Sequence, residues 1–272
     1  MATLRRIRHR LSKSALRRPL VWSRHRGLGR ADGFIGSYPR SGSTWLRFQL
    51  VEILAGQATG FGNVNELIPD VGDHQNAVAL LPDGGHLIKT HEPYRFSYKK
   101  AIYLVRDARD VVLSEFAYQK ALGFAEDDFD KYLPRFLRGE VNPFGSWTAH
   151  VNSWMDAVDN GWTKTLVVRF EDLRHDPEKY LGRILDFLEV RVERARIREA
   201  VENNSLERMR DKERTAPQRA SAKGRFIRSG TVGGWREKFT ESQMRLLQES
   251  SATAALARLG YPAVGLREKE FA

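Results

Sequence analysis

Short apolar runs alternate with longer amphipathic stretches along most of this chain. The short runs are typical of buried parallel strands, and they predict strands at 33–38, 86–90, 101–105 and 165–170. The amphipathic stretches have helical spacing and predict helices at 43–55, 107–122, 127–138, 146–159, 177–188, 193–202 and 240–258. Strands that alternate with helices indicate an α/β fold with a mostly parallel sheet. The polar stretch 211–235 is expected to be a long loop, and loops of that length are usually functional or disordered.

The composition limits the classes of protein that this chain can belong to, but it does not indicate a reaction. The chain has 272 residues, 41% of them hydrophobic, which is long enough to bury a sizeable core. No apolar run approaches the roughly 20 residues that a membrane-spanning helix needs. The absence of cysteine excludes disulfides, thiolate metal sites and a cysteine nucleophile. No carboxylate–histidine cluster has metal-ligand spacing, so no metal is expected.

The net charge of +11 comes almost entirely from the first 30 residues. Residues 1–30 hold ten Lys or Arg and no acid, whereas the rest of the chain holds 35 basic and 34 acidic residues. Leu4, Ile7 and Leu11 recur at helical spacing among arginines, and Pro19 is expected to end that helix. Three interpretations stay open for this tail: a flexible solvated arm, a helix on an anionic membrane surface, or a transit peptide. A nucleic-acid partner is not expected, because residues 31–272 carry nearly equal numbers of basic and acidic side chains.

The segment GSYPRSGSTW (36–45) predicts a strand-to-helix turn that holds a phosphate. Backbone N–H groups and the helix dipole converge at such a turn, and Arg40, Ser41, Ser43 and Thr44 add a positive charge and hydroxyl donors.

The same turn departs from the G-x-x-x-x-G-K-[ST] loop of ATPases and kinases. Five residues separate Gly36 from Gly42, and Ser43 stands where that loop has its lysine. A nucleotide-dependent kinase therefore remains an alternative, with Asp107 as its candidate Mg²⁺ ligand. A nucleotide- or membrane-binding protein without catalysis is the other alternative.

Three further motifs follow in order. IKTHEP (88–93) places His91 just after a predicted strand, where ligands bind in parallel sheets. VRDARDVVLS (105–114) offers Arg106 and Ser114, and RSGTVGGW (228–235) lies in the expected loop.

Together these motifs resemble those of the cytosolic-type sulfotransferases, which take a sulfuryl group from 3′-phosphoadenylyl sulfate (PAPS). YPRSGSTW resembles the family's YPKSGTTW loop, and IKTHEP resembles KTHLP. The segments RFEDL (169–173), SLERM (205–209) and FIRSGTVGGWREKFT (226–240) resemble its YEDL, SFEKM-like and FxRKGxxGDWKxxFT segments. The resemblance implies that 31–272 is one three-layer domain, with a central parallel sheet of about five strands flanked by helices in a P-loop NTPase-like arrangement.

The resemblance also implies roles for individual residues. His91 would be the general base, and Lys89, Arg40 and Ser114 would complete the catalytic set. The donor and its product adenosine 3′,5′-bisphosphate (PAP) would be bound by Arg40, Ser41, Gly42, Ser43, Thr44, Trp45, Arg106, Ser114, Phe170, Leu206, Met209, Arg228, Ser229 and Gly230.

Four positions depart from the family pattern. Arg40 and Ser229 stand where the family has lysine, Leu206 where it often has phenylalanine, and Phe170 where it has tyrosine. We expect Leu206 and Phe170 to alter the affinity for the base of the donor more than the chemistry, and Ser229 to remove one cationic contact. Arg40 could hold the serine and the bridging oxygen at once, so the partner switching attributed to the family's lysine is not carried over to this chain.

The acceptor is not determined by these motifs. An alcohol, phenol or amine is expected, carried by a small molecule, a lipid or a glycan. The loops 57–85, 120–147 and 211–227 are expected to form its pocket, with Phe61, Asn65, His74, Tyr118, Phe124, Phe129 and Tyr132 as candidates. The expected location is cytoplasmic, and peripheral membrane contact through the tail stays one of the open interpretations.

Overall fold

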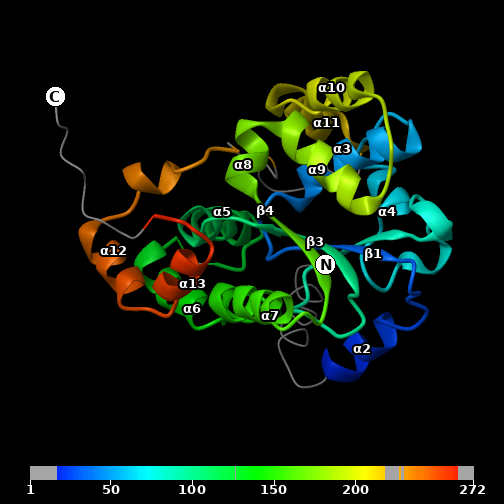
Figure 1. Cartoon of the computed structure of the whole chain (residues 1–272). Coiled ribbons are helices and arrows are strands. Elements are labelled where there is room, and N and C mark those ends of the chain that lie inside the picture. The colour runs from blue at the N-terminus through cyan, green and yellow to red at the C-terminus, as the bar shows by residue number, and fades with distance from the viewer. Residues whose placement is uncertain (1–16, 126, 218–226, 228–229, 263–272) are drawn as a thin grey trace.

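The computed structural model describes residues 17–125, 127–217, 227 and 230–262. Its centre is a sheet of four described strands, all parallel, in the order β2-β1-β3-β4 (Figure 1). The strands are β1 (Gly33–Gly36), β2 (Leu87–Thr90), β3 (Lys100–Val105) and β4 (Lys164–Arg169). All four lie where the apolar runs predict them. The predicted parallel α/β fold is therefore confirmed.

The sheet has a rudimentary extension beside β2. Asp70 forms a parallel bridge with Lys89. Lys89 N donates to Pro69 O at 2.7 Å, and Val71 N donates to Lys89 O at 2.9 Å. Where about five strands are expected, the described residues thus form four strands and this single bridge.

The strand register brings the exits of the strands to one edge of the sheet. Gly36 pairs with Thr90, and Val105 pairs with Arg169. The residues that follow these four are Ser37, His91, Arg106 and Phe170. Three of those are predicted site residues, so the register alone assembles part of the site.

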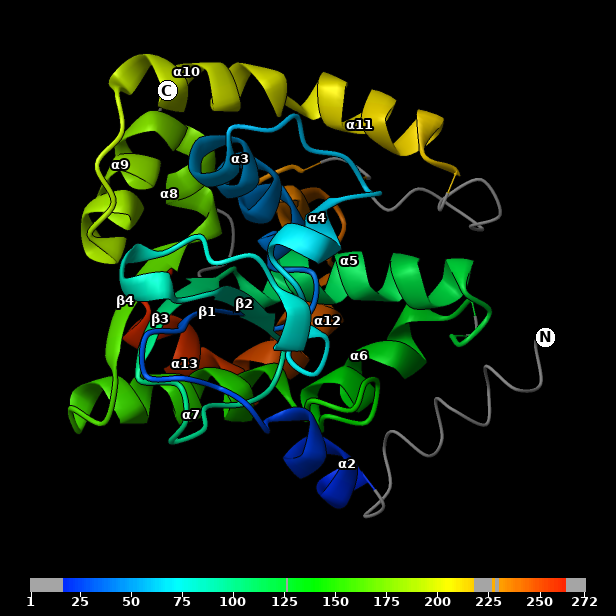
Figure 2. The same ribbon diagram turned by 90° about the vertical axis from the view of Figure 1, so that its right-hand side faces the viewer.

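Two helical layers cover the sheet (Figures 1 and 2). Side chains alternate along β3: Ile102 and Leu104 pack into one core, while Tyr103 and Val105 pack into the other. The first core takes apolar residues from α3 (Ser43–Ala55), α4 (Val64–Leu67), α8 (Phe170–His175), α9 (Pro177–Leu188), α10 (Arg194–Asn203) and α11 (Leu206–Thr215). The second takes them from α5 (Ala108–Ala121), α6 (Phe129–Leu137), α7 (Trp147–Asp159), α12 (Glu241–Gln248) and α13 (Ala252–Arg258). Short 3₁₀ turns lie at His74–Asn76, Pro82–Gly84 and Gly234–Glu237.

Two helix predictions need correction. The predicted helix 240–258 is divided into α12 and α13, because hydroxyls compete for backbone carbonyls at the break: Ser250 Oγ donates to Leu247 O at 2.6 Å, and Thr253 Oγ1 to Gln248 O at 3.0 Å. Helix α11 occupies part of the predicted loop 211–235. It buries Met209 alone, so its sequence has no apolar stripe to reveal it.

The N-terminal segment joins the domain at α2 (Arg17–Arg24). Pro19 lies in the first turn of this helix rather than at its end, and a proline is tolerated there because no intrahelical N–H is needed. Val21 is buried, and His25 Nε2 lies 2.6 Å from the Tyr98 hydroxyl. Residues 17–30 therefore pack against the domain instead of extending from it as an arm.

The amphipathic pattern at Leu4–Leu11 lies outside the described residues, and its membrane role stays a prediction. Within the described part of the chain, no helix has the length and apolar character to cross a membrane.

Candidate functional site

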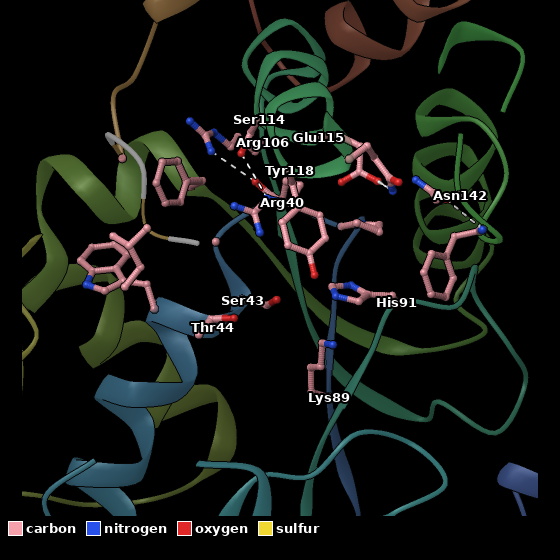
Figure 3. Close-up of a pocket in the computed structure, with 18 of the residues that line it drawn as sticks. Arg40, Ser43, Thr44, Lys89, His91, Arg106, Ser114, Glu115, Tyr118 and Asn142 are labelled. Carbon is pink, nitrogen blue, oxygen red and sulfur yellow. Dashed lines mark hydrogen bonds between the residues drawn. The ribbon is translucent and has the colours of Figure 1, made fainter. Parts of the chain in front are cut away.

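A cavity of about 460 Å³ opens at the carboxyl edge of the sheet (Figure 3). Thirteen predicted site residues line it: Arg40, Gly42, Ser43, Thr44, Trp45, Lys89, His91, Arg106, Ser114, Phe170, Leu206, Met209 and Gly230. Ser41 is buried within the same loop. Arg228 and Ser229 lie outside the described residues. Segments far apart in the sequence thus converge on one cavity.

The loop between β1 and α3 has an unusual backbone. Arg40 has φ 68° and Gly42 has φ 96°, both in the left-handed region. A side chain at Gly42 would meet the Phe170 ring at 2.4 Å, so the close approach requires glycine.

This loop leaves donors for an anion at the start of α3. Gly42 is the N-cap and supplies no side-chain cap, and no other side chain of the described residues replaces it. The first N–H groups of a helix have no intrahelical acceptor. Ser41 Oγ is buried and has no hydrogen-bond partner in the described structure. These are the features of a phosphate site at a helix N-terminus.

Two arginines reach the cavity from the loops that follow β1 and β3. Arg40 Nε donates to Ser114 Oγ at 3.2 Å, and its guanidinium lies 4.7 Å from the centre of the Tyr118 ring. Arg106 donates to Arg40 O at 3.2 Å and to Thr231 O at 2.9 Å. The two cations favour an anion with several negative charges.

Asp110 attaches the segment that carries Thr231 to α5. Its carboxylate accepts from Gly233 N at 2.7 Å and from Trp235 N at 3.1 Å. Burial raises the pKa of Asp110. Sequence reasoning missed this residue, although it lies inside the VRDARDVVLS motif, four residues after Arg106.

His91 has a fixed tautomer. Its Nδ1 lies 2.7 Å from Ser37 O, a carbonyl that can only accept, so Nδ1 carries the proton and Nε2 is the acceptor. Burial, together with the nearby Lys89 charge, lowers the pKa of His91 to about 3. Phe144 packs edge-on against the ring at 5.6 Å. The imidazole is therefore neutral at physiological pH, and one nitrogen can accept a proton.

Lys89 lies two residues before His91 and is paired. Its Nζ is 2.6 Å from Asp70 Oδ1, and its side chain is 11% exposed. Burial lowers the pKa of Lys89, and the Asp70 charge opposes that effect.

Trp45 lines the cavity with its planar indole ring. It packs edge-on against Phe170 with ring centres 6.0 Å apart, and the Arg174 guanidinium lies 5.3 Å from its ring. Leu206 and Met209 line the same region. This wall is flat and largely apolar, as stacking on a base requires.

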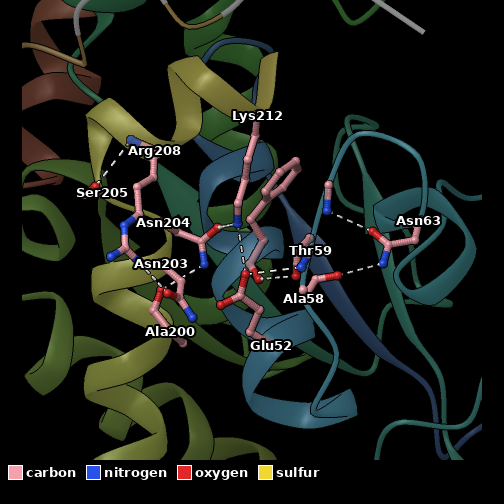
Figure 4. A network of polar contacts seen from close by, with 12 residues as sticks. Glu52, Ala58, Thr59, Asn63, Ala200, Asn203, Asn204, Ser205, Arg208 and Lys212 are labelled. Carbon is pink, nitrogen blue, oxygen red and sulfur yellow. Dashed lines mark hydrogen bonds and ion pairs between the residues drawn. The ribbon is translucent and has the colours of Figure 1, made fainter. Parts of the chain in front are cut away.

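Trp45 is bound to a polar network around Asn204, whose side chains Asn204, Lys212 and Glu52 are shown in Figure 4. Trp45 Nε1 donates to Asn204 O at 2.7 Å. The Asn204 side chain is fully buried; it donates to Ala200 O at 2.8 Å and accepts from Lys212 Nζ at 2.8 Å. Lys212 also pairs with Glu52 at 3.0 Å. The network joins α10 and α11 to α3, and sequence reasoning missed it because its members lie far apart along the chain.

Replacing Asn204 with alanine tests this network. We expect the free energy of unfolding to fall by about 1–3 kcal/mol, because buried partners lose their hydrogen bonds. Urea denaturation measures the change. The neighbouring Asn203→Ala is the matched control, since Asn203 contacts Arg208 at the surface, and a change within about 0.5 kcal/mol is expected there. Equal stability of both variants would contradict a structural role for the network.

The acceptor candidates fall into two groups. Tyr118 and Phe124 line the cavity, together with Leu122, Pro143 and Phe144. Figure 3 shows the Tyr118 ring against Arg40 and its hydroxyl turned toward His91.

The other five candidates do not line this cavity. Phe61 packs on Phe48, Asn65 accepts from Arg47, and His74 accepts from Gly72 N. Phe129 and Tyr132 pack on Phe116. Their expected place in the wall of this cavity is wrong, because each side chain packs or forms a hydrogen bond elsewhere.

Asp107, the expected Mg²⁺ ligand of the kinase alternative, is already engaged. It caps α5 by accepting from Arg109 N at 2.9 Å, and its carboxylate pairs with the Arg109 guanidinium at 2.6 Å. It does not line the cavity. Within the described ranges, no group of three or more His, Cys, Asp or Glu residues is arranged to hold a metal ion.

Comparison with known proteins agrees with this geometry. The family described as "Sulfotransferase domain" matches residues 30–259. The chain belongs to this sulfotransferase family. Mouse (Mus musculus) sulfotransferase 1B1 is 28% identical over 242 residues, which cover 78% of each chain. Human (Homo sapiens) sulfotransferase 1C2 is 25% identical and covers 80% of this chain and 81% of its own.

A solved structure resembles this sulfotransferase over most of its length. Mouse sulfotransferase SULT7A1, complexed with PAP, has a TM-score of 0.66 at 25% identity, covering 85% of this chain and 87% of its own. Retinol dehydratase in a complex with retinol and PAP shares the fold with a TM-score of 0.64 at 20% identity. The matched range 30–259 includes every predicted site residue of this sulfotransferase.

Proposed function

We propose that this sulfotransferase moves a sulfuryl group from PAPS to a hydroxyl or amine acceptor and releases PAP. The observation that carries the proposal is the position of a neutral histidine, with one nitrogen able to accept a proton, on the same cavity as the phosphate loop and two arginines. The PAP complex of the similar mouse structure supports the choice of donor.

In this proposal, His91 removes the acceptor's proton. The acceptor oxygen or nitrogen attacks the sulfur of the donor, the bond from that sulfur to the bridging phosphate oxygen breaks, and the proton goes to His91 Nε2. A neutral base near the reacting atom contributes typically 10²–10⁴-fold. Lys89 would stabilise charge on the transferred group, and Arg40 the charge that develops on the leaving phosphate.

The donor's phosphates would occupy the two ends of the basic region. The start of α3, with Ser41, Ser43 and Thr44, suits the 5′-phosphate. Arg106 and Ser114 suit the 3′-phosphate. The backbone at Gly230 would complete that pocket, as would Arg228 and Ser229, by resemblance to the family.

The base of the donor would stack on Trp45, with Phe170, Leu206 and Met209 around it. Arg40 differs from a lysine here because one planar guanidinium already contacts Ser114 and Tyr118. It can keep the serine contact while it binds a phosphate oxygen, which a single ammonium does less easily.

The acceptor side supports a molecule with an apolar or aromatic part, because Phe124, Phe144 and Leu122 form its wall. A small molecule, a lipid or a glycan carrying such a part fits this proposal. A cytoplasmic location belongs to the same proposal, whereas contact of the basic N-terminal segment with an anionic membrane stays a separate prediction.

The donor assignment is tested by calorimetry with PAP, AMP and ATP in the absence of Mg²⁺. PAP should bind about 10–150-fold more tightly than AMP, because a charge-assisted contact to the 3′-phosphate is worth roughly 1.5–3 kcal/mol.

Equal affinities for PAP and AMP would refute the PAPS assignment. Tight binding of ATP that appears only with Mg²⁺ would instead support the kinase alternative. PAP binding without turnover of any acceptor would favour the non-catalytic alternative.

A further inference from the structure

Asp70 contacts the lysine of the site from outside the cavity. Lys89 lines the cavity, whereas Asp70 does not. The Asp70 carboxylate lies 2.6 Å from Lys89 Nζ, and its side chain is 37% exposed. One lysine thus lines the cavity and pairs with a carboxylate that does not.

The backbone fixes Asp70 in this position. Lys89 exchanges backbone hydrogen bonds with Pro69 and Val71, the two neighbours of Asp70. Arg47 holds the segment just before them, since its buried guanidinium donates to Val64 O, Ile68 O and Asn65 Oδ1. The carboxylate is therefore presented by a bridged segment and not by a free loop.

The charges around Lys89 determine how strongly it holds its proton. Removing an ammonium from water disfavours its charged form, and burial does lower the pKa of Lys89. The charged or titratable groups that face Lys89 are Asp70, Arg47, Arg24 and His91. The two arginines lower the pKa of Lys89 further, whereas Asp70 raises it. Asp70 is the anion of this set, and it favours a protonated Lys89.

We propose that Asp70 is a positioning residue that keeps Lys89 charged and directed at the transferred sulfuryl group. This inference rests on the proposed sulfuryl transfer. A lysine without its proton could not stabilise negative charge on the sulfuryl oxygens. A lysine without its partner would also lose its fixed direction.

The test is Asp70→Asn, which keeps the shape of the side chain and removes its charge. We expect kcat to fall about tenfold or more, with the KM for the acceptor little changed. The reason is that the Lys89 charge would stabilise the transition state and not the bound acceptor. The alkaline limb of the kcat profile should move to lower pH by about 1–3 units, since an opposite charge at this distance shifts a pKa by that amount. The direction follows because Lys89 acts when protonated and a lower pKa removes its proton at a lower pH.

Two matched variants separate this role from a general loss of structure. Glu189→Gln removes a carboxylate that pairs with Lys100 at the opposite end of the sheet, and it should leave kcat and the pH profile unchanged. Combined with Lys89→Met, Asp70→Asn should cost no further activity, because Asp70 acts through Lys89. A further loss of similar size in the double variant would overturn the positioning role.

A measurement without turnover distinguishes this inference from the donor assignment. The pKa of Lys89 can be followed by NMR of ¹³Cε-labelled lysines, with Lys89→Met to assign its signal. Asp70→Asn should lower that pKa. An unchanged pKa and an unchanged alkaline limb would overturn the role of Asp70 even if PAP binds, whereas failure of PAP to bind the unaltered protein would refute the donor instead.

Discussion

Replacing His91 with alanine should lower kcat by about 10²–10⁴-fold, the usual contribution of a general base. Affinity for PAP should stay nearly unchanged, because His91 bonds to Ser37 O and not to Ser41, Ser43 or Thr44, the side chains that would bind the 5′-phosphate. Turnover with a saturating acceptor and PAP calorimetry measure the two effects separately. Wild-type turnover in this variant would exclude His91 as the base.

The control for this prediction lies at the other end of the same strand. His86 bonds to Asp32 at 2.9 Å near the start of β2, so His86→Ala should keep kcat while losing some stability. The pH profile adds a check on the unaltered enzyme. Since burial and Lys89 lower the pKa of His91 to about 3, kcat/KM should stay level between about pH 7 and pH 5, where an ordinary histidine becomes protonated. A fall centred near pH 6.5 would contradict the lowered pKa.

Replacing Arg106 with alanine should weaken PAP binding by about 10–150-fold and leave AMP binding nearly unchanged. The reason is that the lost contact is to the 3′-phosphate, which AMP lacks. The preference for PAP over AMP should therefore largely disappear. Calorimetry with both nucleotides measures this, and AMP serves as the internal control.

Arg106 also has structural contacts, so a second variant is needed. It donates to Arg40 O and Thr231 O and lies 4.5 Å from the Phe170 ring centre. Arg106→Lys keeps the charge but not the planar fork, so it should retain part of the preference for PAP. If both variants lost AMP and PAP binding equally, Arg106 would organise the loop and would not read the 3′-phosphate.

Local patterns predicted the secondary elements that carry an apolar stripe. Helix α9 begins and ends where its periodicity predicts, and α5 lies within the predicted helix 107–122. The pattern failed where hydrophobic periodicity was weak or interrupted. Helix α11 is polar and buries one residue, and the hydroxyls of Ser250 and Thr253 interrupt the last predicted helix.

The sequence by itself determined the parallel α/β order, the strand-to-helix turn between β1 and α3, and the family, because these depend on residue types at short spacings. Tertiary structure decided which charges meet. Three contacts join residues that lie far apart along the chain. Lys89 pairs with Asp70, Trp45 donates to Asn204 O, and Asp110 binds the 230–235 segment. The pKa of His91 also depends on burial and on Lys89. Contacts of this kind arise when the strand register and the helix packing bring distant side chains together, and no local spacing encodes them.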